Sequence, residues 1–379
     1  MQEKHLHIIA LNVPYPPDYG GVIDLWYKLP ALRDAGVLIH LHCFDYGRGP
    51  ADELLAHCES VWYYPRNTGH QGISNTLPYI VASRRSELLV QRLLQDNYPI
   101  LMEGIHCTFL VQDTRLQGRQ FFVRLHNVEY RYYAAIGRHT RSLLRKLYYR
   151  IESYLLKKYE KRIAGLACFL AVSEADLKVY QDSFNCRQVR LLPLFIPDWH
   201  VQCQEGMGTY CLYHGDLSID ANEQAVRWLL TQVFAGLQLP FVIAGRNPSA
   251  GLQQLVAANK HCCLVANPSE SALQDMLIRA HIHVLPSFTN TGIKWKLLYA
   301  LYHGRHVVAN QATVTGSGLE AACHIVETAD AFRDQIEELY HQPFGDPDLQ
   351  LRRSVLSNQF DNARNARSLC TCIWDTPSS

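Results

Sequence analysis

Residues 285–310 read "LPSFTNTGIKWKLLYALYHGRHVVAN" and decide the fold. An apolar run, a polar loop, a stretch of helical spacing, a glycine and a second apolar run predict a strand, a helix and a parallel strand. Lys294 and Lys296 fall in the first turn of this helix, where the partial positive charge of the helix N-terminus disfavours cations. A bound diphosphate would reverse that sign, so we expect an anion here. The alternative is that both lysines extend into solvent.

The same alternation runs outward through the chain. Strands are predicted at 5–12, 39–44, 60–65, 100–104, 120–127, 168–173, 209–215, 239–245, 262–267, 282–288, 306–310 and 324–327. Short apolar strands separated by helices indicate parallel sheets covered on both faces. The pattern weakens at 196–208, which we interpret as a linker. We therefore predict an α/β protein with two doubly wound, Rossmann-like parallel-sheet domains facing a cleft.

The expected boundaries are 1–197 for an acceptor-side domain and 209–345 for a donor domain. A helical pattern at 348–372 is expected to pack back on the first domain. Ligands of such sheets bind beyond the carboxyl ends of the strands.

Composition points to a globular protein of a reducing compartment. The 379 residues include 36 basic and 35 acidic side chains, a balance that gives no indication of nucleic-acid binding. The twelve cysteines lie mostly inside apolar runs, which favours buried thiols over disulfides or a zinc site. No apolar run is long enough to span a bilayer. We expect a cytoplasmic chain that can also lie peripherally on the inner membrane face.

Several loops after predicted strands suit an anionic or sugar ligand. Gly20 and Gly21 open the first helix and leave backbone N–H groups accessible. Gly215 follows the first strand of the second domain, and Arg246 follows the next, where a guanidinium could clamp a diphosphate. "VANPSES" places Asn267 and Pro268 before a helix that Ser269 could cap. Each feature also has a plain structural explanation, as turn, cap or solvated side chain.

Four stretches together resemble a known family: "PYPPDYGGVIDLWYKLPALRDAGVLIHLHCF", "VRLHNVEYRYY", "LYHGDLS…FVIAGRNPS" and "LPSFTNTGIKWKLLYALYHGRHVVANQATVTGSGLE". They are similar to family 4, group 1-like glycosyltransferases of the GT-B fold, of the type found in bacterial polysaccharide gene clusters. The resemblance covers nearly the whole chain. It implies an enzyme that moves a sugar from a nucleotide-diphosphate donor to a glycan or lipid-linked acceptor, in surface polysaccharide or glycolipid biosynthesis.

The resemblance also implies roles for particular residues. It places the sugar-side histidine at His126 and the donor-binding positions at Gly20, Gly21, Gly215, Arg246, Asn267, Pro268, Thr291, Gly292, Ile293, Lys294, Lys296, Tyr299, Ser317, Gly318 and Leu319. The family's usual acidic pair is missing, because Gly292 and Tyr299 stand at those two positions. We interpret Lys294 and Lys296 as compensating in diphosphate binding; the alternative is a chain that has lost activity.

The expected chemistry is glycosyl transfer without a cofactor. Cations and N–H groups aimed at the leaving diphosphate lower the barrier. No Asp-x-Asp cluster suits a divalent ion, so we expect no metal. His126, whose charge is tunable near neutrality, is the first catalytic candidate, and Glu103 and His106 could line the acceptor side. The resemblance favours retention of configuration, whereas either of the latter two could serve as base in an inverting reaction.

Residues 138–162 form a basic amphipathic pattern with nine Lys or Arg and two Glu. Such a helix is attracted to anionic lipid, and peripheral membrane contact would suit a lipid-linked acceptor. A solvated helix of the first domain is the equal alternative. Two other functions stay open: a non-catalytic GT-B protein that binds nucleotide sugar, and a sugar-nucleotide epimerase of the same fold.

Overall fold

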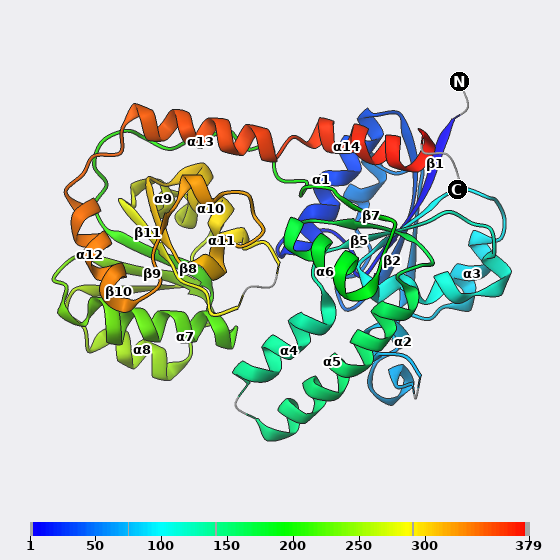
Figure 1. The fold of residues 1–379 in the computed structure, drawn as a ribbon, viewed down its shortest axis with the longest axis horizontal. Coiled ribbons are helices and arrows are strands. Elements are labelled where there is room, and N and C mark those ends of the chain that lie inside the picture. The colour runs from blue at the N-terminus through cyan, green and yellow to red at the C-terminus, as the bar shows by residue number, and fades with distance from the viewer. Residues whose placement is uncertain (1–2, 75, 141, 290–291, 376–379) are drawn as a thin grey trace. The chain divides into compact units, whose positions relative to one another are not determined.

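The computed structural model describes residues 3–74, 76–140, 142–289 and 292–375. It divides the chain into two compact units (Figure 1). The first comprises Met1–Pro197 and Phe360–Ser379, and the second comprises Asp198–Gln359. Among the described residues, no helix combines the length and the apolar character that crossing a bilayer requires.

The first unit is built on a seven-stranded parallel sheet in the order β3-β2-β1-β4-β5-β6-β7. Its strands are β1 (Lys4–Ala10), β2 (Val37–Asp45), β3 (Ser60–Pro65), β4 (Ile100–Glu103), β5 (Phe121–Leu125), β6 (Cys168–Ala171) and β7 (Val189–Leu191). Successive residues of β1 enter different cores: Leu6 and Ile8 pack in one buried cluster and Ile9 in the other. Both faces of this sheet are therefore covered, as its apolar strands predicted.

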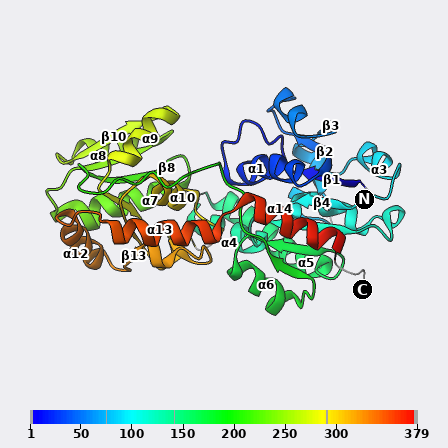
Figure 2. The same cartoon turned by 90° about the horizontal axis from the view of Figure 1, so that it is seen from above.

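Helices from both ends of the chain cover one face of the first sheet. α1 (Gly20–Asp34) and α14 (Asn362–Cys370) share a core with β1 and β2, and Figure 2 shows the red α14 on this unit. The other face carries α3 (Glu87–Leu93), α5 (Leu143–Ile163) and α6 (Glu174–Phe184). The remaining elements are α2 (Tyr79–Ala82), α4 (Glu129–His139), the 3₁₀ turns η1 (Asp52–Ala56), η2 (Gly69–Gly72), η3 (Ile105–Gln112) and η4 (Thr114–Leu116), and the π-turn η8 (Thr371–Asp375).

The second unit is built on a six-stranded parallel sheet in the order β10-β9-β8-β11-β12-β13. Its strands are β8 (Cys211–Asp216), β9 (Phe241–Arg246), β10 (Cys262–Ala266), β11 (Ile282–Leu285), β12 (His306–Ala309) and β13 (His324–Ile325). Its helices are α7 (Asp220–Trp228), α8 (Ala250–Ala257), α9 (Glu270–Arg279), α10 (Trp295–His303), α11 (Gln311–Val314), α12 (Ala329–Tyr340) and α13 (Asp346–Gln359), with short turns η5 (Leu229–Val233), η6 (Phe234–Gly236) and η7 (Glu320–Ala322). The two-sheet α/β architecture predicted from the sequence is confirmed.

The segment 285–310 forms the expected β11, α10 and β12. The helix starts later than its sequence pattern suggests, so Lys294 is the N-cap and Lys296 the second helical residue. Gly304 is the C-cap of this helix, and only glycine fits here, because a Cβ at this position would lie 1.8 Å from Nε2 of His283.

The C-terminal pattern at 348–372 divides into two helices. α13 belongs to the second unit, whereas α14 belongs to the first. The break falls at Phe360 and Asp361, and Asp361 caps α14 by accepting a hydrogen bond from the backbone N–H of Arg364 at 2.8 Å. Only the last part of the expected returning helix thus packs on the first sheet.

The predicted linker at 196–208 is largely part of the second unit. The indole of Trp199 packs against the ring of Tyr299 with centroids 4.7 Å apart. The N–H of Gln202 donates to the carbonyl of Tyr302 at 2.7 Å, and Gly206 forms an antiparallel bridge with Phe344. These contacts explain why the unit begins near Asp198 and not at residue 209.

Candidate functional site

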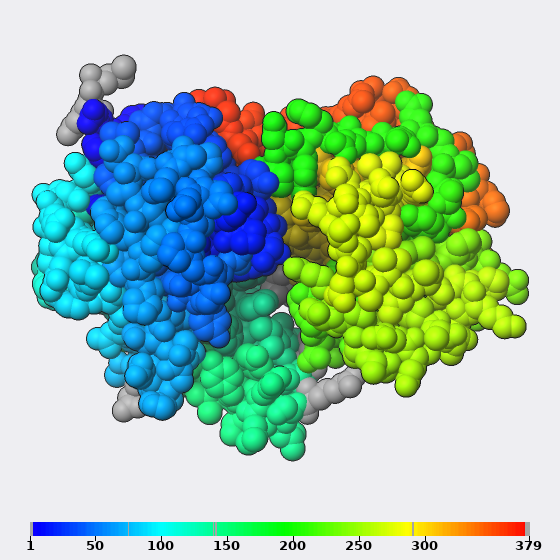
Figure 3. Space-filling view, turned by 180° about the vertical axis from the view of Figure 1, so that it is seen from behind, coloured from blue at the N-terminus to red at the C-terminus, as the bar shows by residue number. Residues whose placement is uncertain are grey.

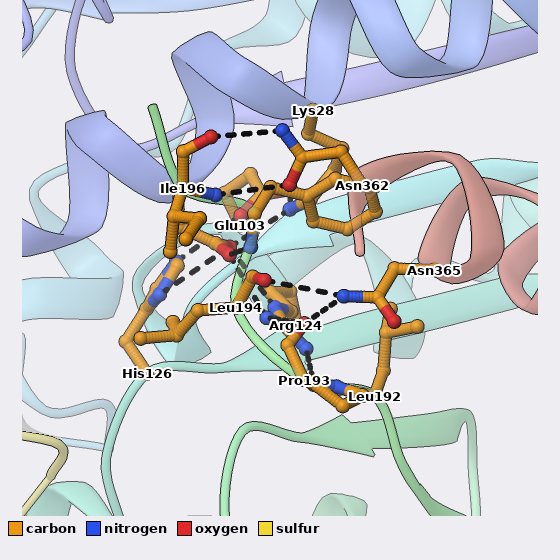
Figure 4. Close-up of polar contacts among 12 residues, drawn as sticks. Lys28, Glu103, Arg124, His126, Leu192, Pro193, Leu194, Ile196, Asn362 and Asn365 are labelled. Carbon is orange, nitrogen blue, oxygen red and sulfur yellow. Dashed lines mark hydrogen bonds and ion pairs between the residues drawn. The ribbon is translucent and has the colours of Figure 1, made fainter. Parts of the chain in front are cut away.

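In the first unit, β4 and β5 end in a buried network of charged side chains (Figure 4). The ammonium of Lys28, on α1, donates to Oε1 of Glu103 at 2.6 Å and lies 3.1 Å from Oδ2 of Asp24. The guanidinium of Arg124 donates to both oxygens of Asp24 at 2.9 and 3.0 Å. These four side chains have at most 1% of their surface exposed, so two cations and two carboxylates neutralise one another away from water.

The network holds both carboxylates in the ionised form. Burial alone would raise the pKa of Asp24, but Arg124 and Lys28 outweigh it and hold this pKa far below its usual range. Burial likewise opposes ionisation of Glu103, yet Lys28 and His126 lower the pKa of that carboxyl. Glu103 is therefore an anion at neutral pH with both oxygens already engaged.

His126 lies at the edge of this network, just after β5. Its Nε2 is 3.1 Å from Oε2 of Glu103, and its Nδ1 is 4.0 Å from Oδ2 of Asp24. A Cβ on Gly21 would lie 4.0 Å from Cδ2 of the imidazole. Gly21, at the start of α1, thus lies beside His126 at this edge of the sheet; that these residues face a ligand stays a prediction.

His106 approaches the same edge from η3. Burial lowers the pKa of His106 well below its usual value, with further contributions from Arg84 and His126. Its Nδ1 is buried and has no hydrogen-bond partner among the described residues. Gly104 has a φ of +78°, and a Cβ there would lie 2.8 Å from that nitrogen. The imidazole is therefore neutral.

The network has some features of a metal site. Among the described residues, Asp24, Glu103 and His126 form a group whose potential ligand atoms all lie within 4.8 Å of one another. The ammonium and guanidinium groups of Lys28 and Arg124 already balance the two carboxylates. This donor set therefore fits a closed ion network better than a cation site.

Arg124 also fixes the chain that leads out of the first unit. It donates to the carbonyls of Leu192 and, at 3.0 Å, Pro193. From α14, the side-chain amide of Asn362 bonds both the N–H and the carbonyl of Ile196, at 3.0 and 2.8 Å (Figure 4). The charged network thus links the sheet edge near His126 to residues 192–196.

In the second unit, Lys296 lies at the carboxyl end of β8. Its Nζ donates to Oη of Tyr213 at 3.0 Å and to Oδ1 of Asn222 at 3.1 Å, and it lies 4.7 Å from the centroid of the Tyr213 ring. Within the described part of the chain, no carboxylate comes within 4.0 Å of this ammonium. Burial, with Lys294 nearby, lowers the pKa of Lys296 to about 7. The ammonium is held by neutral groups, and the described residues offer it no counter-ion.

Other predicted donor-binding residues surround the same strand ends. Gly215 ends β8, and a Cβ there would lie 3.5 Å from the side chain of Asn222. Arg246 ends β9 and is more than half exposed, 4.0 Å from Oδ2 of Asp216. Asn267 adopts a left-handed conformation with φ of 51°, and its Oδ1 accepts a hydrogen bond from the N–H of Asn247 at 2.8 Å. Pro268 follows, and Ser269 caps α9 as expected.

The entrance of α10 is described only in part. Thr291 lies outside the described residues. Gly292 has a φ of +64°, and Ile293 and Lys294 are partly exposed. Nζ of Lys294 is 3.5 Å from Oγ1 of Thr289.

Four predicted positions, Ser317, Gly318, Leu319 and Tyr299, lie in mainly structural surroundings. Ser317 and Leu319 are buried, and the Ser317 hydroxyl donates to the carbonyl of Val314 at 2.6 Å. Gly318 between them is exposed with φ of +70°. Tyr299 packs edge-on against Trp199 in an aromatic cluster.

Sequence reasoning missed several residues that organise these sites. In the first unit they are Asp24, Lys28 and Arg124, and in the second they are Tyr213 and Asn222. The sequence did contain a signal for two of these residues. Asp24 and Lys28 fall among the apolar positions of α1 and not on a polar face, which indicates that they are buried together. The pairing of Lys296 with Asn222 joins residues 74 positions apart, and no local pattern predicts it.

Comparisons with known proteins agree with the resemblance. Residues 208–342 match the family model described as Glycosyl transferases group 1. A relative described as an uncharacterized 44.6 kDa protein in the cps region of Klebsiella pneumoniae is 24% identical over 334 residues, covering 82% of this chain and 84% of the relative. The family match confirms the expected enzyme class, a glycosyltransferase.

Solved structures of similar fold cover nearly the whole chain. Sucrose-phosphate synthase from Thermosynechococcus elongatus superposes with a TM-score of 0.70 at 15% identity, covering 97% of this chain and 98% of that one. S. aureus TarM, solved with UDP and sugar ligands, superposes with a TM-score of 0.66 at 10% identity, covering 98% of this chain and 100% of that one. Anabaena HepE, solved with UDP and glucose, superposes with a TM-score of 0.64 at 12% identity, covering 98% of this chain and 100% of that one. These similarities confirm the GT-B fold.

Proposed function

We propose, from the premise that residues 208–342 form a group 1 glycosyltransferase domain within a GT-B fold, that this protein transfers a sugar from a nucleotide-diphosphate donor to a glycan or lipid-linked acceptor. The second unit holds the donor. The reaction retains configuration and needs no metal, and it serves surface polysaccharide or glycolipid assembly. The relative in a cps region supports the role in polysaccharide assembly. Because two similar structures contain UDP, UDP is the first donor nucleotide to test.

The observation that carries this proposal is the ammonium of Lys296. Its hydrogen bonds go to the neutral groups of Tyr213 and Asn222, so its charge is not balanced there. A partly buried cation without a counter-ion among the described residues is costly, and charged groups with perturbed pKa values cluster at functional sites. A diphosphate at the ends of β8 and β9 would supply the missing charge, with Arg246 as a second cation near the same strand ends.

The chemistry follows from this placement. As the bond between the anomeric carbon and the diphosphate oxygen breaks, the electron pair goes to the diphosphate, and the ammonium of Lys296 stabilises that charge. The acceptor hydroxyl forms the new glycosidic bond on the same face of the sugar, and its proton passes to the departing phosphate oxygen.

In the first unit, His126 contacts the transferred sugar. Glu103 acts as a positioning residue, because both its oxygens are engaged by Lys28 and His126. This arrangement favours retention over a mechanism in which Glu103 abstracts the acceptor proton.

The test is nucleotide release from a panel of UDP-, GDP- and dTDP-sugars, with and without EDTA, and NMR of the product anomeric proton. We expect release from one donor, unchanged by EDTA, with the anomeric configuration of the donor kept. Inversion, or loss of activity in EDTA, would contradict that part of the proposal. Thermal stabilisation by donors without any turnover would favour a non-catalytic binding protein.

A further inference from the structure

The helical hairpin of α4 and α5 carries a row of large apolar side chains on its outer surface. Six residues of α5 are between 41% and 83% exposed: Leu143, Leu144, Leu147, Tyr148, Ile151 and Tyr154. Single exposed apolar residues are normal, but a contiguous set on one helix marks an interaction site. In the space-filling view, the teal residues of this hairpin stand out from the body of the first unit (Figure 3).

The six residues form one stripe. At about 100° per residue they fall within an arc of roughly 140° of the α5 circumference. The buried residues of α5, such as Leu156, Tyr159 and Ile163, lie on a separate arc that packs in the core of the first unit. The stripe is therefore not the core-facing side of an amphipathic helix, because α5 has a second apolar face with nothing from the described chain covering it.

All exposed charged side chains of α5 are positive. Seven cations lie on the helix: Arg145, Lys146, Arg150, Lys157, Lys158, Lys161 and Arg162. Its two acids, Glu152 and Glu160, are buried and accept hydrogen bonds from the backbone N–H groups of Tyr79 and Tyr130. Glu129, the acid of α4, is buried as well. The exposed surface of both helices is thus apolar and cationic, without an exposed carboxylate among their described side chains.

We infer that this hairpin docks the protein on an anionic lipid bilayer, with the apolar stripe inserted at the headgroup boundary. From Leu143 to Tyr154 the stripe is about 16 Å long at 1.5 Å per residue. Lys157, Lys158 and Lys161 follow in the next turns, where they can reach lipid phosphates. A second copy of the chain fits less well, because it would bring a like-charged surface against this one.

The inference rests on the proposed function in one respect: a lipid-linked acceptor would explain why the protein binds a membrane. The observations behind it, the exposed apolar stripe and the positive surface, are independent of the donor site. Lipid binding can therefore be tested without measuring glycosyl transfer.

The experiment is flotation of the full chain with vesicles of phosphatidylcholine containing 30% phosphatidylglycerol, and with vesicles of phosphatidylcholine alone. We expect at least tenfold stronger partition to the anionic vesicles, weakened by 0.5 M salt. A triple variant, Leu144→Ser, Leu147→Ser and Ile151→Ser, and a charge variant, Lys146→Glu and Arg150→Glu, should each reduce partition at least tenfold. All five positions are exposed, so both variants should keep the melting temperature of the wild type.

A matched control is the pair Leu55→Ser and Leu88→Ser, which removes exposed leucines elsewhere in the first unit and should leave partition unchanged. Equal binding to both vesicle types, or a triple variant that floats like the wild type, overturns the inference. Analytical ultracentrifugation gives the other decisive result: a wild-type dimer that the triple variant converts to monomer would identify a second copy as the occupant and overturn lipid docking. Loss of flotation with donor turnover intact separates this surface from the donor site.

Discussion

Replacing Lys296 with methionine should stabilise the free protein while weakening nucleotide binding. Burial lowers the pKa of Lys296 from 10.5 to about 7. Because the folded-state pKa lies below the unfolded one, the unfolded chain binds more protons between these values. The charge therefore destabilises the fold fully below pH 7, and this penalty disappears as pH rises towards 10.5.

The size of the effect follows from that shift. At 1.36 kcal/mol per pKa unit the penalty has an upper limit near 5 kcal/mol. Because Lys296 is only partly buried, we expect a gain in the range of about 1–4 kcal/mol known for replacing buried charged groups by apolar side chains of similar size. For a domain the size of the second unit, each kcal/mol raises the melting temperature by about 2–4 °C. Differential scanning calorimetry at pH 6.5 measures this gain.

Binding should change in the opposite direction. Loss of charged hydrogen bonds to a diphosphate costs about 1.5–3 kcal/mol, which is about a 10- to 150-fold rise in the Kd for UDP. A lysine with a pKa near 7 is about half protonated at pH 7, so binding to the wild type should take up roughly half a proton, and more at pH 8. Titration calorimetry in buffers of different ionisation enthalpy measures this uptake, which the variant should lack.

Lys260→Met is the matched control, because Lys260 is exposed in the same unit. It should change neither the melting temperature nor the Kd. A Lys296→Met protein with unaltered affinity for UDP, or a wild type that binds UDP without proton uptake at pH 7 and 8, would refute the assignment of this ammonium to the donor site.

Three further substitutions test the fold around the sites. Lys28→Met should destabilise the protein by about 3–5 kcal/mol, and by more at pH 8 than at pH 5, because loss of the cation raises the pKa of Glu103 and favours its protonated form. Glu129→Gln should raise the melting temperature at pH 8.5 more than at pH 5, because burial and Glu160 raise the pKa of Glu129 from 4.5 to about 8; the folded state therefore loses stability as pH rises between these values, and the full penalty is reached only above pH 8. Gly304→Ala should cost at least about 2 kcal/mol in urea denaturation, because its Cβ would overlap the ring of His283.

Each substitution has a control in the same fold. Lys178→Met and Glu174→Gln change exposed residues of α6, and Gly165→Ala adds a Cβ with no atom within 4 Å. Equal melting temperatures for Lys28→Met and Lys178→Met would show that the buried ion network does not contribute to stability. An effect of Glu129→Gln that does not vary with pH would contradict the assigned direction of its pKa.

The strands were predictable because parallel strands covered on both faces are apolar along their length. β7 was missed as a separate strand, since it has three residues and two of them, Arg190 and Leu191, are exposed. The end of the first domain at residue 197 agrees with the structure. The second domain begins at Asp198 and not at 209, because residues 196–208 lack periodicity in the sequence although Trp199 packs on Tyr299 of α10.

The site was predictable only as far as local sequence shows it. The sequence pointed to glycines and basic residues after strands, and the structure places them at the carboxyl ends of strands in both sheets, while their part in ligand binding stays a prediction. The partners of those residues were not visible. Arg124 lies two residues before His126, near the end of β5, yet it bonds Asp24, 100 positions away. Such pairings arise from packing, which alternation and spacing do not encode.

The first unit is made of two stretches of the sequence that lie before and after the second unit, and this order has a consequence for synthesis. α14 supplies Ala366, Leu369 and Cys370 to the core beneath α1. At roughly 5–20 residues per second, translation completes the second unit before these last residues exist. Residues 1–197 thus leave the ribosome before the second unit but can complete their fold only after it, and until α14 is made an apolar surface of the first unit stays uncovered.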